Sequence, residues 1–274
     1  MTRQYCHIGS STIAYLDSAP GDITLRTYVL LHAFPLGANQ WEPQMRSIPA
    51  GWRLITPDLR GFGGSTELDS LSALAISDYA DDVVDLLGEL SVSRAVIGGL
   101  SMGGYVALAL LQGAPQIIEA LVLADTRATA DSPDGRANRR DLLALVDREG
   151  PSGVAREMMP KLLGKTTREL NPSAEAQVRR LIKQQSPVAI RSAIHRMMHR
   201  PDATALLPLV TVPTLVIVGE EDELTPPDDS RRIAEAVPGA TLVTIPGAGH
   251  LSNLEQPDAF NAALNGFLAK LQER

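Results

Sequence analysis

The chain has 274 residues, of which 44% are hydrophobic and 21% are charged, as is typical of a globular protein with one domain, or with one domain and a large insertion. The formal net charge of −7 argues against binding to nucleic acid or to an acidic membrane surface. The single cysteine, Cys6, excludes an internal disulfide, and the sequence has neither a recognisable secretory leader nor a run of about 18 apolar residues. We therefore expect a cytoplasmic protein with no membrane partner, which is either a monomer or a homo-oligomer.

The first part of the chain predicts short strands separated by turns and helices. The strands of an N-terminal hairpin and two buried strands are expected over Tyr5–Ile8, Thr12–Leu16, Thr27–Leu31 and Trp52–Thr56. Helices are expected over Gln40–Ser47 and over Ile76–Leu90, where apolar residues recur at helical spacing and Ser77 is the expected N-cap. The glycine-rich stretch Pro57–Ser65 lacks the lysine and the spacing of a phosphate-binding loop, so we interpret it as a structural turn.

A serine flanked by glycines, Ser101, lies between a predicted strand over Ala95–Ile97 and a predicted helix over Met102–Gln112. The sequence Gly99-Leu100-Ser101-Met102-Gly103 has the pattern G-x-S-x-G, which on a strand, turn and helix forms a nucleophile elbow. Such a turn brings together the chain two residues before the serine and two residues after it, where a Cβ atom would collide. Because glycine and serine are common residues, the pattern alone also fits an ordinary strand–helix turn.

The rest of the chain continues the alternation of strands and helices, apart from one long helical stretch. Strands are expected over Ala120–Ala124, Thr214–Val218 and Thr241–Ile245, and helices over Asp228–Val237 and Pro257–Leu271. Residues 127–203, called the cap below, have no aromatic residue and show helical patterns over Arg139–Arg148, Val154–Leu163, Ala174–Gln184 and Val188–His199. The cap carries 15 basic and 9 acidic residues, whereas the chain as a whole is acidic.

These elements predict an α/β protein with a mostly parallel, doubly wound sheet. Residues 1–126 and 204–274 are expected to form its core, and residues 127–203 an inserted helical cap. In such sheets, ligands bind at the carboxyl ends of the strands. Five polar residues each follow a predicted strand and are expected to meet at that edge: His32, Ser101, Asp125, Asp222 and His250.

A serine hydroxyl needs a base to become a nucleophile, and the base needs a carboxylate to orient it. Of the five histidines, His250 is the expected base, because it follows the last strand in a glycine-rich loop and completes the order Ser, Asp, His. The same order favours Asp222 as the acid, with Asp125 as the alternative. Three glutamates surround Asp222, so the alternative interpretation of this stretch is a solvated acidic loop: Glu220, Glu221 and Glu223.

Backbone groups are expected to complete the site. In a nucleophile elbow the oxyanion is bound by the N–H of the residue after the nucleophile, here Met102, and by an N–H from the loop after an earlier strand, where Phe34 is the expected donor. His32 in that loop is expected to fix the loop rather than to act in catalysis. No cluster of His, Cys, Asp and Glu has the spacing of a metal site, so we expect neither a metal nor a cofactor.

Five stretches together carry a resemblance to a known family: HAFPL at His32–Leu36, PDLRGFGGS at Pro57–Ser65, GLSMGG at Gly99–Gly104, VGEEDELTPP at Val218–Pro227 and GAGHLSNLEQP at Gly247–Pro257. Over essentially its whole length the chain resembles the α/β-hydrolase superfamily, and within it small carboxylesterases and 3-oxoadipate enol-lactone hydrolases. The resemblance implies the α/β-hydrolase fold, with Ser101, Asp222 and His250 as nucleophile, acid and base. It also implies cleavage of a small carboxylic ester or lactone through an acyl-enzyme. Ala33 departs from the glycine usual in relatives, and its Cβ is expected to narrow the loop beside the oxyanion hole.

Several activities remain open for these residues. The serine at the elbow and the absence of tyrosine from the cap exclude haloalkane dehalogenases and epoxide hydrolases, relatives that use an aspartate nucleophile. Carbon–carbon bond hydrolases and cofactor-free perhydrolases share the triad, and a binding or signalling protein with slow or no turnover has the same fold. The basic cap suggests an anionic substrate, although solvated arginines are the simpler interpretation.

Overall fold

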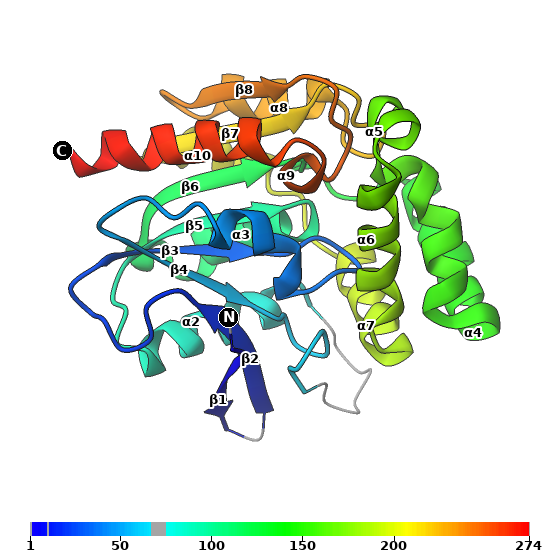
Figure 1. Cartoon of the computed structure of the whole chain (residues 1–274), viewed down its shortest axis with the longest axis horizontal. Coiled ribbons are helices and arrows are strands. Elements are labelled where there is room, and N and C mark those ends of the chain that lie inside the picture. The colour runs from blue at the N-terminus through cyan, green and yellow to red at the C-terminus, as the bar shows by residue number, and fades with distance from the viewer. Residues whose placement is uncertain (1, 10, 67–74, 274) are drawn as a thin grey trace.

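A computed structural model describes residues 2–9, 11–66 and 75–273, and these residues form one eight-stranded sheet with helices on both faces (Figure 1). The strands are β1 (Gln4–Ile8), β2 (Ser11–Asp17), β3 (Arg26–Leu31), β4 (Trp52–Pro57), β5 (Ala95–Leu100), β6 (Ile118–Ala124), β7 (Thr214–Gly219) and β8 (Thr241–Ile245). Their order across the sheet is β1-β2-β4-β3-β5-β6-β7-β8. The hairpin β1–β2 pairs antiparallel with itself and with β4, and the pairs from β4 to β8 are parallel. The predicted α/β class with a mostly parallel sheet is confirmed.

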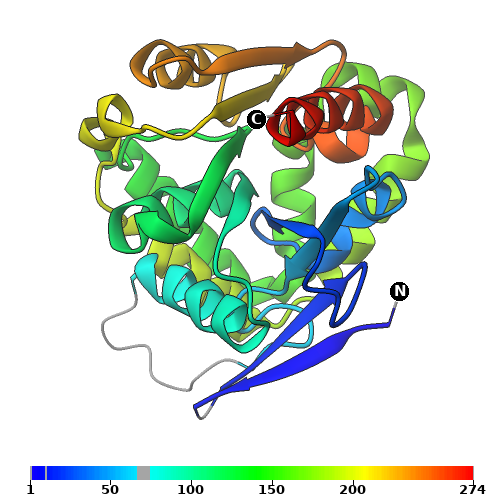
Figure 2. The ribbon, with the colours of Figure 1, turned by 90° about the vertical axis from the view of Figure 1, so that its left-hand side faces the viewer.

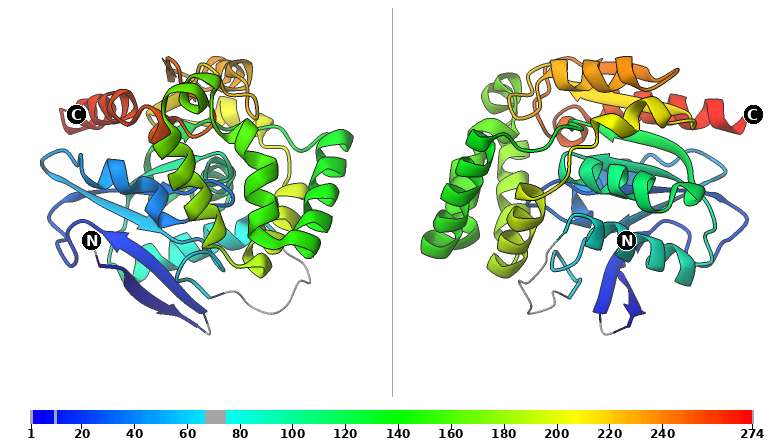
Figure 3. Two further views of the ribbon diagram at one scale, coloured as in Figure 1. Left: turned by 45° about the vertical axis from the view of Figure 1, so that its right-hand side comes forward. Right: turned by 180° about the vertical axis from the view of Figure 1, so that it is seen from behind.

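Helices cover the two faces of the sheet, as Figures 1 and 3 show from opposite sides. One face carries α2 (Ser77–Glu89), α3 (Met102–Gly113) and α8 (Pro227–Ala236), and the other carries α1 (Glu42–Met45), α9 (Ser252–Glu255) and α10 (Pro257–Gln272). Short 3₁₀ turns occupy Ala38–Trp41, Pro115–Ile117 and Thr204–Leu209. Searching the described helices for a segment that could cross a membrane finds none.

The central strands form because their residues are apolar or small on both faces. All six residues of β5 are buried, as expected for a parallel strand between two helical layers. Helix α2 is amphipathic and buries Tyr79, Val83 and Leu86, among others, against the sheet. The prediction of Ser77 as its N-cap is wrong, because Ser77 is already helical and the Asp78 carboxylate accepts the N–H of Ala75 at 3.0 Å instead.

The cap lies beyond the carboxyl ends of the parallel strands (Figures 1 and 3). It contains α4 (Pro133–Leu162), α5 (Lys165–Leu170), α6 (Pro172–Lys183) and α7 (Pro187–Met198). The two helices expected over Arg139–Arg148 and Val154–Leu163 are the two halves of α4, which Gly150 separates with a non-helical φ of 60° and ψ of −158°. Both ends of the cap leave the sheet together, since the N–H of Ala203 donates to the carbonyl of Ala128 at 2.8 Å.

Side chains anchor the cap to the sheet layers. Arg196 of α7 is 1% exposed; its Nε lies 3.2 Å from the Asp78 carboxylate of α2, and its guanidinium lies 4.6 Å from the centre of the Tyr79 ring. Gln185 accepts the N–H of Gly63 at 3.0 Å, in the turn that follows β4. Figure 2, viewed along the sheet from the side opposite the cap, shows the cap helices behind the strands. The cap therefore covers the edge at which the candidate residues meet.

The turn between β5 and α3 depends on glycines because three backbones meet there. A Cβ on Gly99 would lie 2.1 Å from the backbone of Gly103, and a Cβ on Gly103 would lie 2.1 Å from the carbonyl oxygen of Leu31 in β3. The crowding predicted between the residues two before and two after Ser101 is thus present. The first turn of α3 is pressed against the ends of β3 and β5.

We expect Gly99→Ala to lower the free energy of unfolding by about 3 kcal/mol or more, because the new methyl group overlaps backbone atoms that cannot move independently. Gly88→Ala in α2 is the matched control, since its Cβ would meet no atom within 4 Å. That control should be neutral or stabilise the protein by up to about 1 kcal/mol. Urea unfolding monitored by circular dichroism measures both, and equal stabilities of the two variants would contradict the packing argument.

Candidate active site

Ser101 occupies the strained turn between β5 and α3, with φ 56° and ψ −112°. Two hydrogen bonds hold the turn against β6: the N–H of Ser101 donates to Ala124 O at 2.9 Å, and the Thr126 hydroxyl donates to Ser101 O at 2.8 Å. The serine is 9% exposed and lines a cavity between the sheet edge and the cap. Its backbone is therefore fixed while its side chain remains accessible to a ligand.

His250 and Asp222 form a buried pair next to this serine. Nδ1 of His250 lies 2.8 Å from Oδ2 of Asp222 and 3.0 Å from Oδ1. The Asp222 carboxylate also accepts the N–H groups of Leu224 and Thr225, at 2.8 and 2.9 Å, and the Thr225 hydroxyl at 2.6 Å. Burial alone would raise the pKa of Asp222, but the charge and hydrogen bond of His250 and the donors of Thr225 hold that pKa below its ordinary value. The ionised Asp222 keeps the hydrogen of His250 on Nδ1, so Nε2 is left free to accept a proton.

The other candidate acid, Asp125, is bonded elsewhere. Its Oδ1 accepts the N–H of Gly219 at 2.7 Å, and its Oδ2 accepts the hydroxyl of Ser252. Burial and the nearby charge of Asp222 raise the pKa of Asp125 well above its ordinary value. The structure thus places Asp222, and not Asp125, against His250, while Asp125 links the ends of β6 and β7 to α9.

The expected oxyanion donors lie on two neighbouring segments of the sheet edge. Met102 is the first residue of α3, so its N–H has no partner inside the helix. Among the described residues, the N–H of Phe34 likewise makes no hydrogen bond, and the Phe34 side chain lines the cavity. The preceding residue, Ala33, is fully buried and donates its N–H to the Gln40 side chain at 2.7 Å. Both backbone donors are therefore available to a ligand.

His32 fixes the loop that contains Phe34. It is completely buried, and its Nε2 accepts the N–H of Leu59 at 3.0 Å, in the turn after β4. Its Nδ1 lies 3.0 Å from the carbonyl oxygen of Ala33. Because Nε2 must accept this hydrogen bond and the ring has no access to solvent, burial lowers the pKa of His32. This arrangement agrees with the expected structural role of His32.

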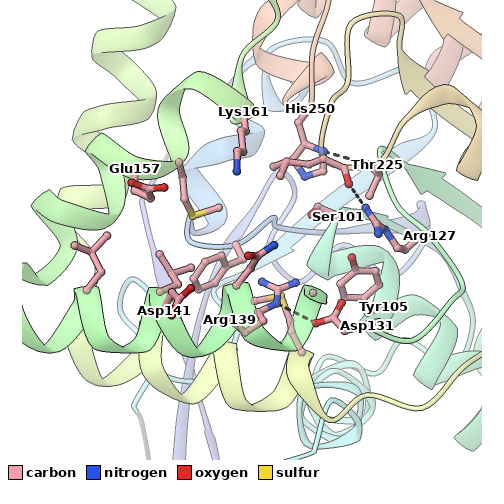
Figure 4. Close-up of a pocket in the computed structure, with 18 of the residues that line it drawn as sticks. Ser101, Tyr105, Arg127, Asp131, Arg139, Asp141, Glu157, Lys161, Thr225 and His250 are labelled. Carbon is pink, nitrogen blue, oxygen red and sulfur yellow. Dashed lines mark hydrogen bonds and ion pairs between the residues drawn. The ribbon is translucent and has the colours of Figure 1, made fainter. Parts of the chain in front are cut away.

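Ser101 and His250 meet in a cavity of about 490 Å³ (Figure 4). No hydrogen bond joins the two side chains in this structure, although both belong to the described residues. Such bonds are often long without substrate and shorten when substrate binds. The volume is that of a site for a small molecule.

The lining of the cavity combines apolar and charged side chains, most of them from α4. The apolar ones are Phe34, Leu142, Leu145, Met158, Met197 and Leu224. The four basic ones are Arg127, Arg139, Arg148 and Lys161, and the three acidic ones are Asp131, Asp141 and Glu157. Asp131 pairs with both Arg139, at 3.1 Å, and Arg200, at 2.7 Å, and Asp229 lies 3.4 Å from Arg127. The excess positive charge of the cap is therefore not concentrated on the cavity.

Two glutamates near the site were missed or misinterpreted from the sequence. The alternative of a solvated loop does not hold for Glu221, because its carboxylate accepts the N–H and the hydroxyl of Thr166, at 2.8 and 2.5 Å. Glu255 is 4% exposed and accepts backbone N–H groups from the cap and from the loop that contains His250. No spacing in the sequence predicts their contacts with the cap, since these contacts span 55 and 91 residues.

Within the residues that the structure describes, no three or more His, Cys, Asp or Glu side chains are grouped so as to hold a metal ion. The ring of His195 in α7 stacks on that of His199, the residue after this helix, with ring centres 6.4 Å apart.

Several known proteins resemble this chain in sequence, and solved structures among them resemble it in fold. Residues 28–263 match the model of the alpha/beta hydrolase family. A thermophilic esterase from Thermogutta terrifontis, solved with malate bound, is 36% identical, with 99% of both chains covered and a TM-score of 0.91. The enol-lactonase from Burkholderia xenovorans LB400 is 27% identical, over 97% of this chain and 100% of its own, with a TM-score of 0.88. A putative non-heme bromoperoxidase from Mycobacterium tuberculosis, BpoC, is 28% identical over 95% of this chain and 98% of its own.

The structural role of His32 predicts a pH-dependent stability. Because its pKa is lowered in the folded protein, its contribution is complete above the unfolded value of about 6.5 and is lost as the pH falls toward the folded value. We expect His32→Asn to be less stable than the wild type at pH 8, and the difference to shrink below pH 6.5 by at most about 1.4 kcal/mol per pH unit. Urea unfolding between pH 8 and pH 5 measures it. His7→Asn, in the exposed hairpin, is the control, and a pH-independent difference for His32→Asn would contradict the prediction.

Proposed function

Because the chain belongs to the alpha/beta hydrolase family, we propose that it is a serine hydrolase that cleaves small carboxylic esters or lactones through an acyl-enzyme. The resemblance inferred from the five motifs is confirmed by this membership. The esterase and the enol-lactonase among its relatives support a carboxylic ester hydrolase, and both align with nearly the full length of this chain. The proposal concerns the residues that act and the bond that they break.

One observation carries the proposal most directly: the 2.8 Å contact between His250 Nδ1 and Asp222 Oδ2, with Ser101 lining the same cavity. An imidazole oriented by a buried carboxylate presents Nε2 as a general base. A serine on a strained turn presents Oγ to that base. The arrangement therefore supports Ser101 as nucleophile, His250 as base and Asp222 as the acid that orients it.

In the first half of the reaction, Ser101 Oγ attacks the carbonyl carbon of the substrate while its proton passes to His250 Nε2. The oxyanion that forms accepts hydrogen bonds from the N–H groups of Phe34 and Met102. Removing a single donor of this kind typically costs about 2.7–4 kcal/mol of transition-state stabilisation. Asp222 stabilises the imidazolium, and His250 then returns the proton to the departing alcohol or to the opened lactone oxygen.

In the second half, water replaces the alcohol. His250 removes a proton from the water, which attacks the acyl carbon held on Ser101, and the acid leaves when the serine regains its proton. Thr225 supports both halves, because its hydroxyl donates to Asp222 at 2.6 Å and so helps to keep that carboxylate ionised. These steps use only groups of the chain and water.

A second activity is favoured by one relative. The protein named as a putative non-heme bromoperoxidase is 28% identical over most of this chain, and the same acyl-enzyme would form a peracid if hydrogen peroxide replaced water. Halide oxidation in acetate buffer with peroxide distinguishes this perhydrolase reaction from hydrolysis. Carbon–carbon bond cleavage would require a different substrate in the same cavity, and a substrate panel that includes a β-diketone tests it.

We expect Ser101→Ala to lower kcat for p-nitrophenyl acetate by about a thousandfold or more, because the acyl-enzyme cannot form. The fold should be unchanged, as shown by near-ultraviolet circular dichroism. Ser192→Ala is the matched control, since Ser192 is a buried serine of α7 outside the cavity lining. Undiminished turnover by Ser101→Ala would refute the mechanism, and a single burst without steady turnover by the wild type would favour a binding or signalling protein.

The nearly balanced charges of the cavity predict little preference for anionic substrates. For matched neutral and carboxylated esters we expect kcat/KM to differ by less than about threefold at low ionic strength, with little change at high salt. Stopped-flow or steady-state assays at two salt concentrations measure this ratio. A preference of tenfold or more for the carboxylated ester, lost at high salt, would contradict this prediction. It would indicate electrostatic steering by basic side chains such as Lys161, which points into the cavity in Figure 4.

A further inference from the structure

Two carboxylates outside the proposed triad connect the cap to the loops that hold Asp222 and His250. Glu255 belongs to α9, directly after the His250 loop, and Glu221 precedes Asp222. Both accept hydrogen bonds from one short stretch of the cap, Gly164–Thr167, which begins where α4 ends. This stretch, called the docking segment, is the place where the cap meets both catalytic loops.

Glu255 joins the docking segment to the His250 loop. Its Oε2 accepts the N–H of Gly164 at 2.8 Å, and its Oε1 accepts the N–H of Leu251, the residue after His250, at 3.0 Å. Burial raises the pKa of Glu255, while the Thr167 hydroxyl and the N–H groups of Gly249, Gly164 and Leu251 oppose that rise. One buried carboxylate thus binds the amide of the residue after His250 and the amide of the first residue of the docking segment.

Glu221 joins the docking segment to the loop that holds Asp222. Its carboxylate accepts the N–H and the hydroxyl of Thr166, at 2.8 and 2.5 Å. Its own N–H donates to the carbonyl oxygen of Ala248 at 2.7 Å, so the two catalytic loops are also bonded directly to each other. The acid, the base and the docking segment are parts of one hydrogen-bonded unit.

The backbones of this unit are in direct contact. A Cβ on Gly249 would lie 2.2 Å from the N atom of Gly164, and a Cβ on Gly219 would lie 2.1 Å from the carbonyl oxygen of Gly249. Neither Gly249 nor Gly164 has room for a side chain, since a Cβ on Gly164 would lie 2.5 Å from the Glu221 carboxylate. A shift of the docking segment must therefore move the His250 loop with it.

We propose that Glu255 is a positioning residue for His250. Its carboxylate fixes the His250 loop and the docking segment relative to each other. The proposal rests on the proposed function, because it assumes that His250 is the base. The turn of α4 before Gly164 contains Lys161 and Met158, which line the cavity. A substrate held by that turn is therefore mechanically connected to the base through Glu255.

The partners of Glu255 also indicate its charge. Within the described residues, all the groups that contact its carboxylate donate a hydrogen, so the ionised form is the one that they suit. A negative charge here favours the protonated form of the neighbouring imidazole. The other titratable or charged groups around His250 come from three further elements: Glu221 and Asp222 after β7, Asp125 and Arg127 after β6, and Lys161 at the end of α4.

Glu255→Gln tests the proposal, because it keeps the shape of the side chain, removes the charge and replaces one acceptor by a donor. We expect kcat to fall about tenfold or more while KM changes less than about threefold. The reason is that the position of the base affects the stability of the transition state more than the affinity for the substrate. The acidic limb of the kcat/KM profile should move to lower pH by about half a unit or more, because the charge that favours protonated His250 is gone. The control is Glu89→Gln, at the exposed end of α2, which should match the wild type in all three quantities.

Two results would overturn the proposal: an unchanged kcat and acidic limb, or a fall in kcat that matches a loss of folded protein while the limb stays in place. If Glu255→Gln does not fold, Thr167→Val removes one donor from the carboxylate and should lower kcat about two- to fivefold; wild-type kcat in that variant would likewise overturn it. The Ser101→Ala variant distinguishes a failure of the proposed function from a failure of the role of Glu255. If Ser101→Ala keeps its turnover, both the proposed function and the role of Glu255 fail. If Ser101→Ala is inactive while Glu255→Gln behaves like the wild type, only the role of Glu255 is overturned.

Discussion

The close approach of three backbones behind Ser101 is the constraint on which the site depends. Gly99 and Gly103 let the first turn of α3 touch both β5 and the end of β3, and β3 leads into the loop that contains Phe34. The serine, the free N–H at the start of α3 and the N–H of the Phe34 loop are therefore held in place by the sheet itself. The positive φ of Ser101 costs on the order of 1–3 kcal/mol, which the packing of the surrounding strands offsets.

Most of the fold could be predicted because its signals are local. Buried strands such as β5 and β6 are short apolar runs, and α10 begins with a proline and buries one face at helical spacing. Errors occur where a terminus depends on a particular contact. The range of α2 was predicted to within one residue, but its N-cap was not, because Ser77 is already helical and Asp78 accepts the N–H of Ala75 instead. By contrast, the two helices expected in the first half of the cap are both present, because Gly150 interrupts α4 with a non-helical backbone conformation.

The order of the motifs along the sequence predicts which residues are candidates for the site. The structure shows which of these residues are in contact. The order of motifs favours Asp222 over Asp125, and the contacts agree with this preference. The roles of Glu221 and Glu255 could not be predicted, because their partners in the docking segment are 55 and 91 residues away in the chain. The charge of the cavity also had to be observed, since the excess of basic residues in the cap says nothing about which face each of them occupies.

The hydrogen bond between Ala203 and Ala128 means that both ends of the cap leave the sheet at a single neck. In topological terms the cap is one large loop between β6 and β7, so residues can be gained or lost inside it without shifting the parallel register of these strands. It is nevertheless not freely interchangeable with other insertions. A transplanted cap, whether acquired in evolution or by design, must offer a side-chain-free residue against Gly249 and amide hydrogens for Glu221 and Glu255. The neck permits exchange of the cap, and the docking segment restricts which replacements keep the His250 loop in its present position.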